Sequence, residues 1–335
     1  MDLAGSFLGS SWVRATARSL SWHMLYRFAN FDLSCAVGSA AMATTPNNSA
    51  GSLRPEKPPA YARAMPHLTV PGASLYYETD GHASAPALLL LHAGIANLRM
   101  WDPQIAALAA GHFVIRFDSR GFGQTTTEDV PFSNRADAIA VLDHLGVAAA
   151  TLVGCSRGGS IAIDVALEHP DRVAGLVTIG SGPSGFPEVE LTETEDALFD
   201  ELDVAFDAKD WHRLARLEIA LWAIGPLRTE ADLDPEFLSA AYALNRVNVV
   251  HAAENPLPIP LEPPASNRVV DIEVPALVTV GEFDITPALV QYEYLLSALP
   301  QVTGCTFRHT AHLPSVERPA EFERMLVAWL AENGL

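Results

Sequence analysis

The sequence predicts an α/β fold in which a mostly parallel sheet is covered by helices on both faces. From about residue 66 onward, short apolar runs alternate with segments in which apolar residues recur at helical spacing. The apolar runs are continuous, which is typical of parallel strands buried on both faces. A longer helical stretch, residues 183–267, interrupts this alternation once and predicts a small helical cap inserted into a main domain of residues 66–335.

The predicted elements follow one another in a regular order. His67–Val70 and Ser74–Glu78 flank Pro71-Gly72 and predict an initial hairpin. The later predicted strands are Ala87–Leu91, His112–Phe117, Ala148–Val153, Val173–Ile179, Ala276–Val280 and Val302–Arg308. The predicted helices of the main domain are Met100–Leu108, Asn134–Leu145, Gly158–Leu167, Leu289–Leu299 and Ala320–Leu330. Those of the insertion, expected over the carboxyl ends of the strands, are Ala197–Phe206, Trp211–Ile224 and Glu236–Asn248.

Composition and charge exclude several classes of function. The chain has 335 residues, of which 49% are hydrophobic and 18% charged, so it can bury a large core and is not a disordered chain. Its formal net charge of -19 repels nucleic acid and anionic membranes, so neither is an expected partner. The sequence has no apolar run long enough to predict a membrane span. Cys35, Cys155 and Cys305 form neither a disulfide framework nor a metal-ligand spacing, which favours a reducing, cytoplasmic location.

The first 65 residues differ from the rest because their basic residues outnumber their acidic ones. A signal peptide would need a compact apolar core after a short basic head, and the apolar stretch Leu33–Met42 comes late and follows Asp32. An organelle transit peptide remains an alternative, since acid-poor segments rich in Ser and Arg suit it. The favoured interpretation is a disordered extension, translated from a start upstream of Met65 or Met42.

The strongest motif is Gly154-Cys155-Ser156-Arg157-Gly158, which follows a predicted strand and opens a predicted helix. This is the context of a nucleophile elbow, in which a tight turn exposes a serine hydroxyl at the top of a sheet. Glycines on either side leave room for the turn, and the helix N-terminus supplies N–H groups and a positive dipole end. The pattern therefore predicts Ser156 as a nucleophile, whereas a turn with a capping serine is the alternative.

A serine nucleophile needs a base and an acid that orients the base, and in this type of fold they follow it in the order acid, then histidine. The acid should follow a late strand, where Asp284 is favoured over Glu282 because its loop reaches beyond the strand end. The base should follow the last strand, where the loop residue His312 is favoured over His309, which adjoins the strand.

The oxyanion of an acyl-transfer reaction needs two N–H donors. One is the backbone N–H of Arg157, directly after the serine. The second is expected in the loop after Ala87–Leu91, where Gly94 is favoured and Ala93 or Ile95 are alternatives. His92, in the same loop, is interpreted as an anchor for that loop rather than a catalytic group.

Together these motifs resemble the α/β-hydrolase superfamily of the AB hydrolase-1 type over residues 67 to 335. The similarity is greatest to small capped bacterial members such as 3-oxoadipate enol-lactonases, pimeloyl-carrier-protein methyl esterases and carbon–carbon bond hydrolases. The motifs are His92-Ala93-Gly94, Met100-Trp101-Asp102-Pro103-Gln104, Asp118-Ser119-Arg120-Gly121-Phe122-Gly123, the elbow, Gly281-Glu282-Phe283-Asp284, and His312 with Glu317 and Pro319. The resemblance implies a triad of Ser156, Asp284 and His312, an oxyanion hole of the Gly94 and Arg157 N–H groups, and no metal or other cofactor.

The leading hypothesis is a serine hydrolase, a monomer or homodimer, that acts on a small carboxylic ester or lactone through an acyl-enzyme. One alternative is a carbon–carbon bond hydrolase of dienoic ring-fission products, and another is a non-catalytic ligand-binding homologue. Many relatives carry Met, Leu or Gln where this chain has Arg157, which is expected to pair with an acid of the cap or to attract a substrate carboxylate. Further carboxylate anchors would be Lys209, Arg213, Arg216, Arg228 and Arg246. Aromatic residues expected to line or support an apolar pocket are Phe199, Phe206, Trp211, Trp222 and Tyr242.

Overall fold

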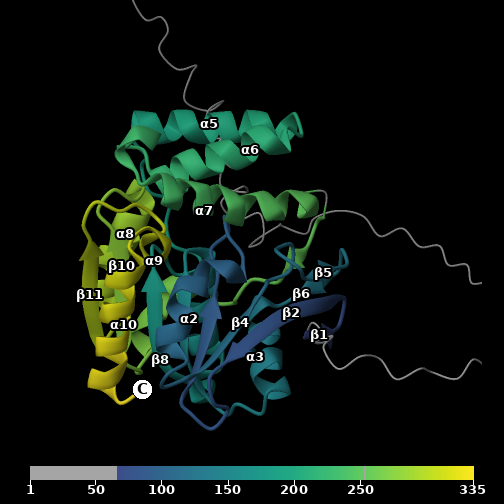
Figure 1. The fold of residues 1–335 in the computed structure, drawn as a ribbon, viewed down its shortest axis with the longest axis vertical. Helices are drawn as coiled ribbons and strands as arrows, with labels where there is room; N and C mark the ends of the chain where they lie inside the picture. The colour runs from purple at the N-terminus through teal and green to yellow at the C-terminus, as the bar shows by residue number, and fades with distance from the viewer. Residues whose placement is uncertain (1–65, 253) are drawn as a thin grey trace, which may run out of the picture.

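A computed structural model describes residues 66–252 and 254–335 of the chain (Figure 1). The extension expected over residues 1–65 lies outside these described residues. The main sheet has the strand order β1-β2-β4-β3-β7-β8-β10-β11, with β5 (Thr126–Thr127) paired to β2 off this path. The strands on the path are β1 (His67–Val70), β2 (Ala73–Asp80), β3 (Ala87–Leu91), β4 (Phe113–Phe117), β7 (Ala150–Cys155), β8 (Val173–Ile179), β10 (Ala276–Gly281) and β11 (Val302–Phe307).

The pairing confirms the predicted, mostly parallel sheet. All neighbours from β4 to β11 run parallel, whereas the pairings of β2 with β1, β4 and β5 are antiparallel. The carboxyl ends of β7, β8 and β10 lie level, because Cys155 pairs with Ile179 and Ile179 pairs with Thr279. Side chains that follow these strands therefore meet at one edge of the sheet.

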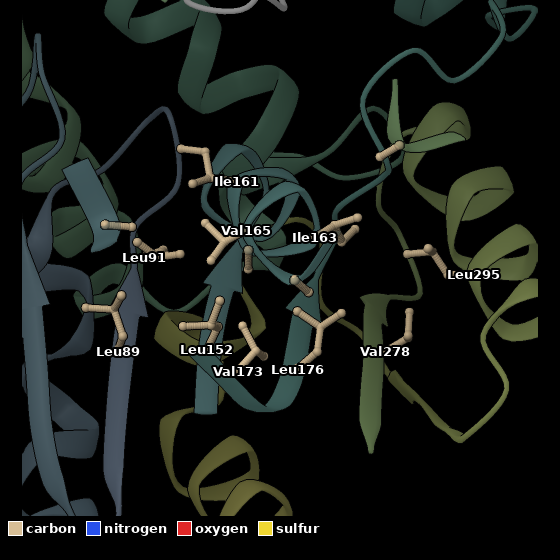
Figure 2. Close-up of a cluster of buried hydrophobic side chains, with 14 of the residues drawn as sticks. Leu89, Leu91, Leu152, Ile161, Ile163, Val165, Val173, Leu176, Val278 and Leu295 are labelled. Carbon is tan, nitrogen blue, oxygen red and sulfur yellow. The ribbon is translucent and has the colours of Figure 1, made fainter. Parts of the chain in front are cut away.

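Helices cover both faces of the sheet, as the continuous apolar runs predict. Leu89 and Leu91 of β3 belong to the core beneath α3, α4 and α8, whereas Leu88 and Leu90 belong to the core beneath α2 and α10. Figure 2 shows the first core, where Ile163 and other apolar side chains of α4 pack over the strands. These helices are α2 (Asp102–Leu108), α3 (Asn134–His144), α4 (Arg157–Glu168), α8 (Thr286–Ala298) and α10 (Pro319–Asn333), and a short helix, α9 (Pro314–Glu317), precedes α10.

Several boundaries differ from the predicted ones by a few residues. Helix α8 begins at Thr286 rather than Leu289, because Pro287 fits the first turn of a helix, where no N–H donor is needed. Strand β7 continues through the elbow glycine to Cys155, since its last residues still pair with β8. These shifts leave the order and type of the elements unchanged.

In its described residues, the insertion between β8 and β10 contains three α-helices, which we call the insertion helices: α5 (Glu193–Asp207), α6 (Trp211–Glu218) and α7 (Pro235–Arg246). They lie above the end of the sheet toward which the arrowhead of β8 points (Figure 1). Thr192, Asp210 and Asp234 cap their N-termini through side-chain oxygens. Helix α6 continues into a π-helical segment, η3 (Ile219–Ile224), which ends at Gly225. The last part of the insertion returns to the main domain as β9 (Leu257–Pro258), paired with β6 (Pro131–Phe132).

Candidate active site

Ser156 occupies the turn between β7 and α4 in a strained conformation, with φ 53° and ψ -121°. Its backbone N–H donates to the carbonyl of Ile179 at 2.7 Å, which fixes the turn against β8. A Cβ at Gly158 would lie 2.2 Å from the carbonyl oxygen of Leu91, and one at Gly154 would lie 2.4 Å from the Gly158 backbone. Only glycine fits at these two positions, so the sequence pattern produces the tight turn that an elbow requires.

Asp284 and His312 form a buried pair. The Nδ1 atom of His312 lies 2.8 and 2.9 Å from the two carboxylate oxygens of Asp284, and the two residues are 2% and 3% exposed, respectively. A carboxylate is an acceptor only, so Nδ1 carries the proton and Nε2 is left as the basic nitrogen. That Nε2 is buried and has no hydrogen-bond partner among the described residues. Ser156 and His312 line the same cavity.

The two rival residues lie elsewhere. Glu282 and His309 are exposed and contact each other, since the Glu282 carboxylate accepts from the backbone N–H of His309 at 2.9 Å. Neither of them lines the cavity. The geometry therefore favours Asp284 and His312 as the acid and the base.

Gly180 is a site residue that sequence reasoning missed. It follows β8 with φ 56°, and a Cβ there would lie 2.8 Å from Oδ2 of Asp284 and 2.9 Å from Nδ1 of His312. The absence of a side chain makes room for the acid–base pair. The signal was present in the sequence, because Gly180 follows its strand just as Ser156 follows the neighbouring strand.

The loop after β3 presents its backbone to the cavity. Gly94 and Ile95 line the cavity, while the N–H of Ala93 donates to Sδ of Met100 at 3.3 Å. Of the three candidate oxyanion donors, Ala93 is therefore not favoured, because its N–H already donates to Met100. His92 anchors the loop as expected, because its Nδ1 bonds the carbonyl of Ala93 and its Nε2 accepts from the N–H of Ser119. Burial lowers the pKa of His92 to about 3, so it stays neutral.

Arg157 begins α4 and also lines the cavity. Its guanidinium lies 5.0 Å from the centre of the Phe122 ring, and it donates to the side-chain oxygen of Asn134 at 2.8 Å. Burial lowers the pKa of Arg157 to about 10, which still leaves the side chain charged at neutral pH. Both named neighbours belong to the main domain rather than to the insertion helices.

Cys155 precedes Ser156 but points into the core. Its side chain is buried, and its Sγ contacts the carbonyl oxygen of His312 at 3.6 Å. Burial raises the pKa of the Cys155 thiol well above its usual value, and the charge of Asp284 adds to this effect. The thiol is therefore unreactive, because a cysteine acts as a nucleophile only as the thiolate.

The cavity has a volume of about 280 Å³ and lies between the strand ends and the insertion. Of the five aromatic residues expected there, Phe199, Trp211 and Trp222 line it. The other two support the insertion, since Phe206 packs on Trp211 and Tyr242 donates to Glu230. None of the five cations suggested as carboxylate anchors lines it.

Two contacts connect the insertion with the histidine of the site. The ring of Trp222, in the π-helical segment η3, lies 4.6 Å from the ring of His312 between centroids. The carbonyl of Trp222 accepts from the backbone N–H of His312 at 3.2 Å. One insertion residue thus holds both the ring and the backbone of His312.

Two general features apply to residues 66–252 and 254–335. No helix in this part of the chain is long and apolar enough to cross a membrane. No group of three or more His, Cys, Asp or Glu side chains in the same part is arranged to hold a metal ion.

Comparison with known proteins identifies the family. A family model described as the alpha/beta hydrolase fold matches residues 86–319, more than half of the chain. The protein belongs to the α/β-hydrolase fold family. This agrees with the sheet order, the elbow and the position of the insertion.

Individual relatives within this family are hydrolases by name. The 3-oxoadipate enol-lactonase 2 of Acinetobacter baylyi is 39% identical over 31% of this chain, a stretch that spans only 40% of that enzyme. The putative carbamate hydrolase RutD of Azorhizobium caulinodans is 28% identical and covers 80% of this chain and 99% of its own. Among solved structures, the enol-lactonase of Burkholderia xenovorans LB400 superposes with a TM-score of 0.64 and 24% identity, over 79% of this chain and 100% of its own. The fold is thus shared along almost the whole of that structure, and the activity class that these comparisons support is that of a hydrolase.

Proposed function

We propose that the protein is a serine hydrolase that cleaves a small carboxylic ester or lactone through an acyl-enzyme intermediate. The observation that carries this proposal is the state of His312. Its Nδ1 is held by Asp284, and its buried Nε2 lacks a protein partner among the described residues beside the cavity that Ser156 lines. An unprotonated nitrogen in this position is what a serine hydroxyl needs to become a nucleophile.

In the proposed reaction, the hydroxyl of Ser156 attacks the carbonyl carbon of the ester while Nε2 of His312 takes its proton. Asp284 stabilises the imidazolium that forms and keeps the ring oriented. The developing oxyanion accepts hydrogen bonds from the backbone N–H groups of Gly94 and Arg157. His312 then gives its proton to the leaving alcohol, and a water molecule activated by the same nitrogen releases the acid and restores the serine.

The ester or lactone class is favoured over carbon–carbon bond cleavage by the lining of the cavity. A diacid substrate would need cationic anchors, and none of the insertion cations Lys209, Arg213, Arg216, Arg228 and Arg246 lines the cavity. Of the two arginines that do line it, Arg157 donates to Asn134 and Arg135 is paired with Glu168. The enol-lactonase name of the Acinetobacter baylyi relative also supports a lactone or ester. We further propose that residues 183–267 form a cap that excludes water from the acyl-enzyme.

The test compares Ser156→Ala with Ser160→Ala in turnover of 4-nitrophenyl butyrate. Ser160 lies one turn further along α4 and also lines the cavity, so its variant controls for the loss of a cavity hydroxyl. We expect Ser156→Ala to lose at least about 10³-fold in kcat and Ser160→Ala to keep most of its activity. A fluorophosphonate probe should label the wild type and not Ser156→Ala. Full activity in Ser156→Ala would refute the proposal, and tight ligand retention without turnover in the wild type would favour a binding protein.

A further inference from the structure

A carboxylate lies in the wall of the cavity two helical turns from Ser156. Asp164 belongs to α4, and with Ser156 and Ser160 it forms a row of every fourth residue that lines the cavity. At 1.5 Å per residue, Asp164 is about 12 Å from Ser156 along the helix axis. The same cavity is also lined by apolar side chains, among them Ile161, Leu261 and Ile285.

The Asp164 carboxylate has no cationic partner of its own. Its Oδ1 accepts a hydrogen bond from the hydroxyl of Ser184 at 2.7 Å. Arg135 is the cation beside it, but Nε of Arg135 is bonded to Glu168 at 2.7 Å. The two terminal nitrogens of Arg135 donate to the carbonyl oxygens of Ile259 and Pro260, at 3.2 and 3.4 Å. Within the described residues, the second oxygen of Asp164 therefore has no hydrogen-bond donor.

The charged groups nearest Asp164 are engaged with partners other than Asp164. Arg135 forms an ion pair with Glu168, and Arg157, the other arginine that lines the cavity, lies two turns away at the start of α4 and donates to Asn134. The strands β3 and β8 beneath α4 carry no titratable side chain, and β7 contributes only the protonated Cys155. On the other elements packed against α4, Arg120 pairs with Asp137, Arg172 with Asp143 and Arg268 with Asp271, whereas Asp171 is exposed and His144 contacts the hydroxyl of Tyr77. Burial raises the pKa of Asp164 to about 6, so at neutral pH the group is ionised in a poorly hydrated site.

We propose that Asp164 is the specificity residue of a subsite that binds a primary ammonium group at the far end of an acyl chain. An apolar wall would hold the methylene groups of the chain, and the open oxygen of Asp164 would accept a charge-assisted hydrogen bond from the ammonium group. The inference rests on the proposed function, because it assigns the substrate class of the same site.

The kinetic test uses three 4-nitrophenyl esters whose acyl chains have the same length of about eight carbons and end in an ammonium, a methyl or a carboxylate group. We expect kcat/KM for the ammonium ester to exceed that for the methyl ester about tenfold at pH 7.5, with the carboxylate ester the poorest. In Asp164→Asn this ratio should fall to about one, while turnover of the methyl ester persists. Asp171→Asn, which removes an exposed carboxylate just beyond α4, should keep the wild-type ratio.

The pH dependence of the ratio gives a second readout. Asp164 has a raised pKa, so it is protonated and neutral below about pH 6 and charged above it. The ratio of the two kcat/KM values should therefore rise as the pH increases through about 6, and this rise should be absent in Asp164→Asn. Any pH-dependent step that is common to both esters cancels in the ratio.

A binding measurement distinguishes a failure of this inference from a failure of the proposed function. Calorimetry with octylammonium and with 1-octanol on the Ser156→Ala variant measures the subsite without turnover. Preferential binding of octylammonium that is lost in Ser156→Ala/Asp164→Asn supports the subsite even if no ester is hydrolysed. Equal binding of the two probes, a kinetic ratio near one in the wild type, or a preference for the carboxylate ester overturns the inference.

Discussion

The insertion is attached to the main domain on two sides, and the two attachments differ in kind. On the side of His312, Arg228 donates to both carboxylate oxygens of Glu317 at 2.6 and 3.1 Å, and the two side chains are only 7% and 6% exposed. Arg228 also donates to the carbonyls of Ala223, Ile224 and His309. This attachment is a buried, charged connection between the end of η3 and the loop that carries His312.

On the side of the Gly94 loop, the attachment consists of single hydrogen bonds made by side-chain amides and by the ring of His251, whose Nε2 bonds the carbonyl of Gly123 at 2.9 Å. The side-chain amide of Asn97 donates to the carbonyl of Leu244 at 3.0 Å, and that of Asn248 donates to the carbonyl of Ala96 at 3.0 Å. The N–H of Gly123 donates in turn to Asn248 at 3.2 Å. Breaking one partner of a buried ion pair costs about 3–5 kcal/mol, whereas a neutral hydrogen bond contributes about 1 kcal/mol. We infer that the insertion separates first on the side of the Gly94 loop, so that a substrate reaches the cavity there while His312 stays held.

The largest expected effect comes from removing the charged attachment. Arg228→Met leaves the carboxylate of Glu317 buried without its cation, and we expect a loss of about 3–5 kcal/mol in the free energy of unfolding. The measurement is urea unfolding followed by circular dichroism. Arg213→Met is the matched control, because its ion pair with Glu201 is exposed, with side-chain exposures of 38% and 55%, and should cost less than about 1 kcal/mol. Equal losses in the two variants would contradict the assignment of Arg228 and Glu317 as a buried ion pair that stabilises the attachment beside His312.

A smaller effect is expected from Trp222, which we regard as a positioning residue for His312. Trp222→Leu removes the ring that packs on His312 and keeps the backbone hydrogen bond, so kcat should fall about tenfold through looser orientation of the base. Trp222→Phe should restore most of the loss. Trp211→Leu is the control, since Trp211 lines the cavity and packs on Phe206, and its effect should appear in KM. A change in KM alone for Trp222→Leu would show that the ring only shapes the cavity.

Local features of the site could be predicted from the sequence, and long-range contacts could not. The elbow around Ser156 depends on glycines next to it in the chain, and the positions of Asp284 and His312 follow from the ends of parallel strands. Trp222 and His312 meet only because the insertion folds back over the sheet, and no local pattern encodes that contact.

Arg228 shows the same limit in another way. Its charge made it a candidate anchor for a substrate carboxylate, yet the structure buries it against Glu317, 89 residues later in the chain. Sequence spacing does not reveal which cations are already paired. Asp164 combines a local feature with a long-range one. Its helical spacing from Ser156 can be read from the sequence, but which cations near it are already paired cannot.

The smallest expected effect tests the attachment beside the Gly94 loop directly. Asn248→Ala removes the hydrogen bonds to Ala96 and Gly123, and we expect a loss of about 1 kcal/mol that is confined to this side of the insertion. Native-state hydrogen exchange should therefore become about fivefold faster in α7, while the amides of η3 keep the wild-type rate. Asn333→Ala removes a comparable amide bond at the end of α10, far along the chain from the insertion, and should leave both segments unchanged. If η3 exchanged faster to the same extent as α7, the insertion would open as one rigid unit, and the difference in strength between its two attachments would have no part in substrate access.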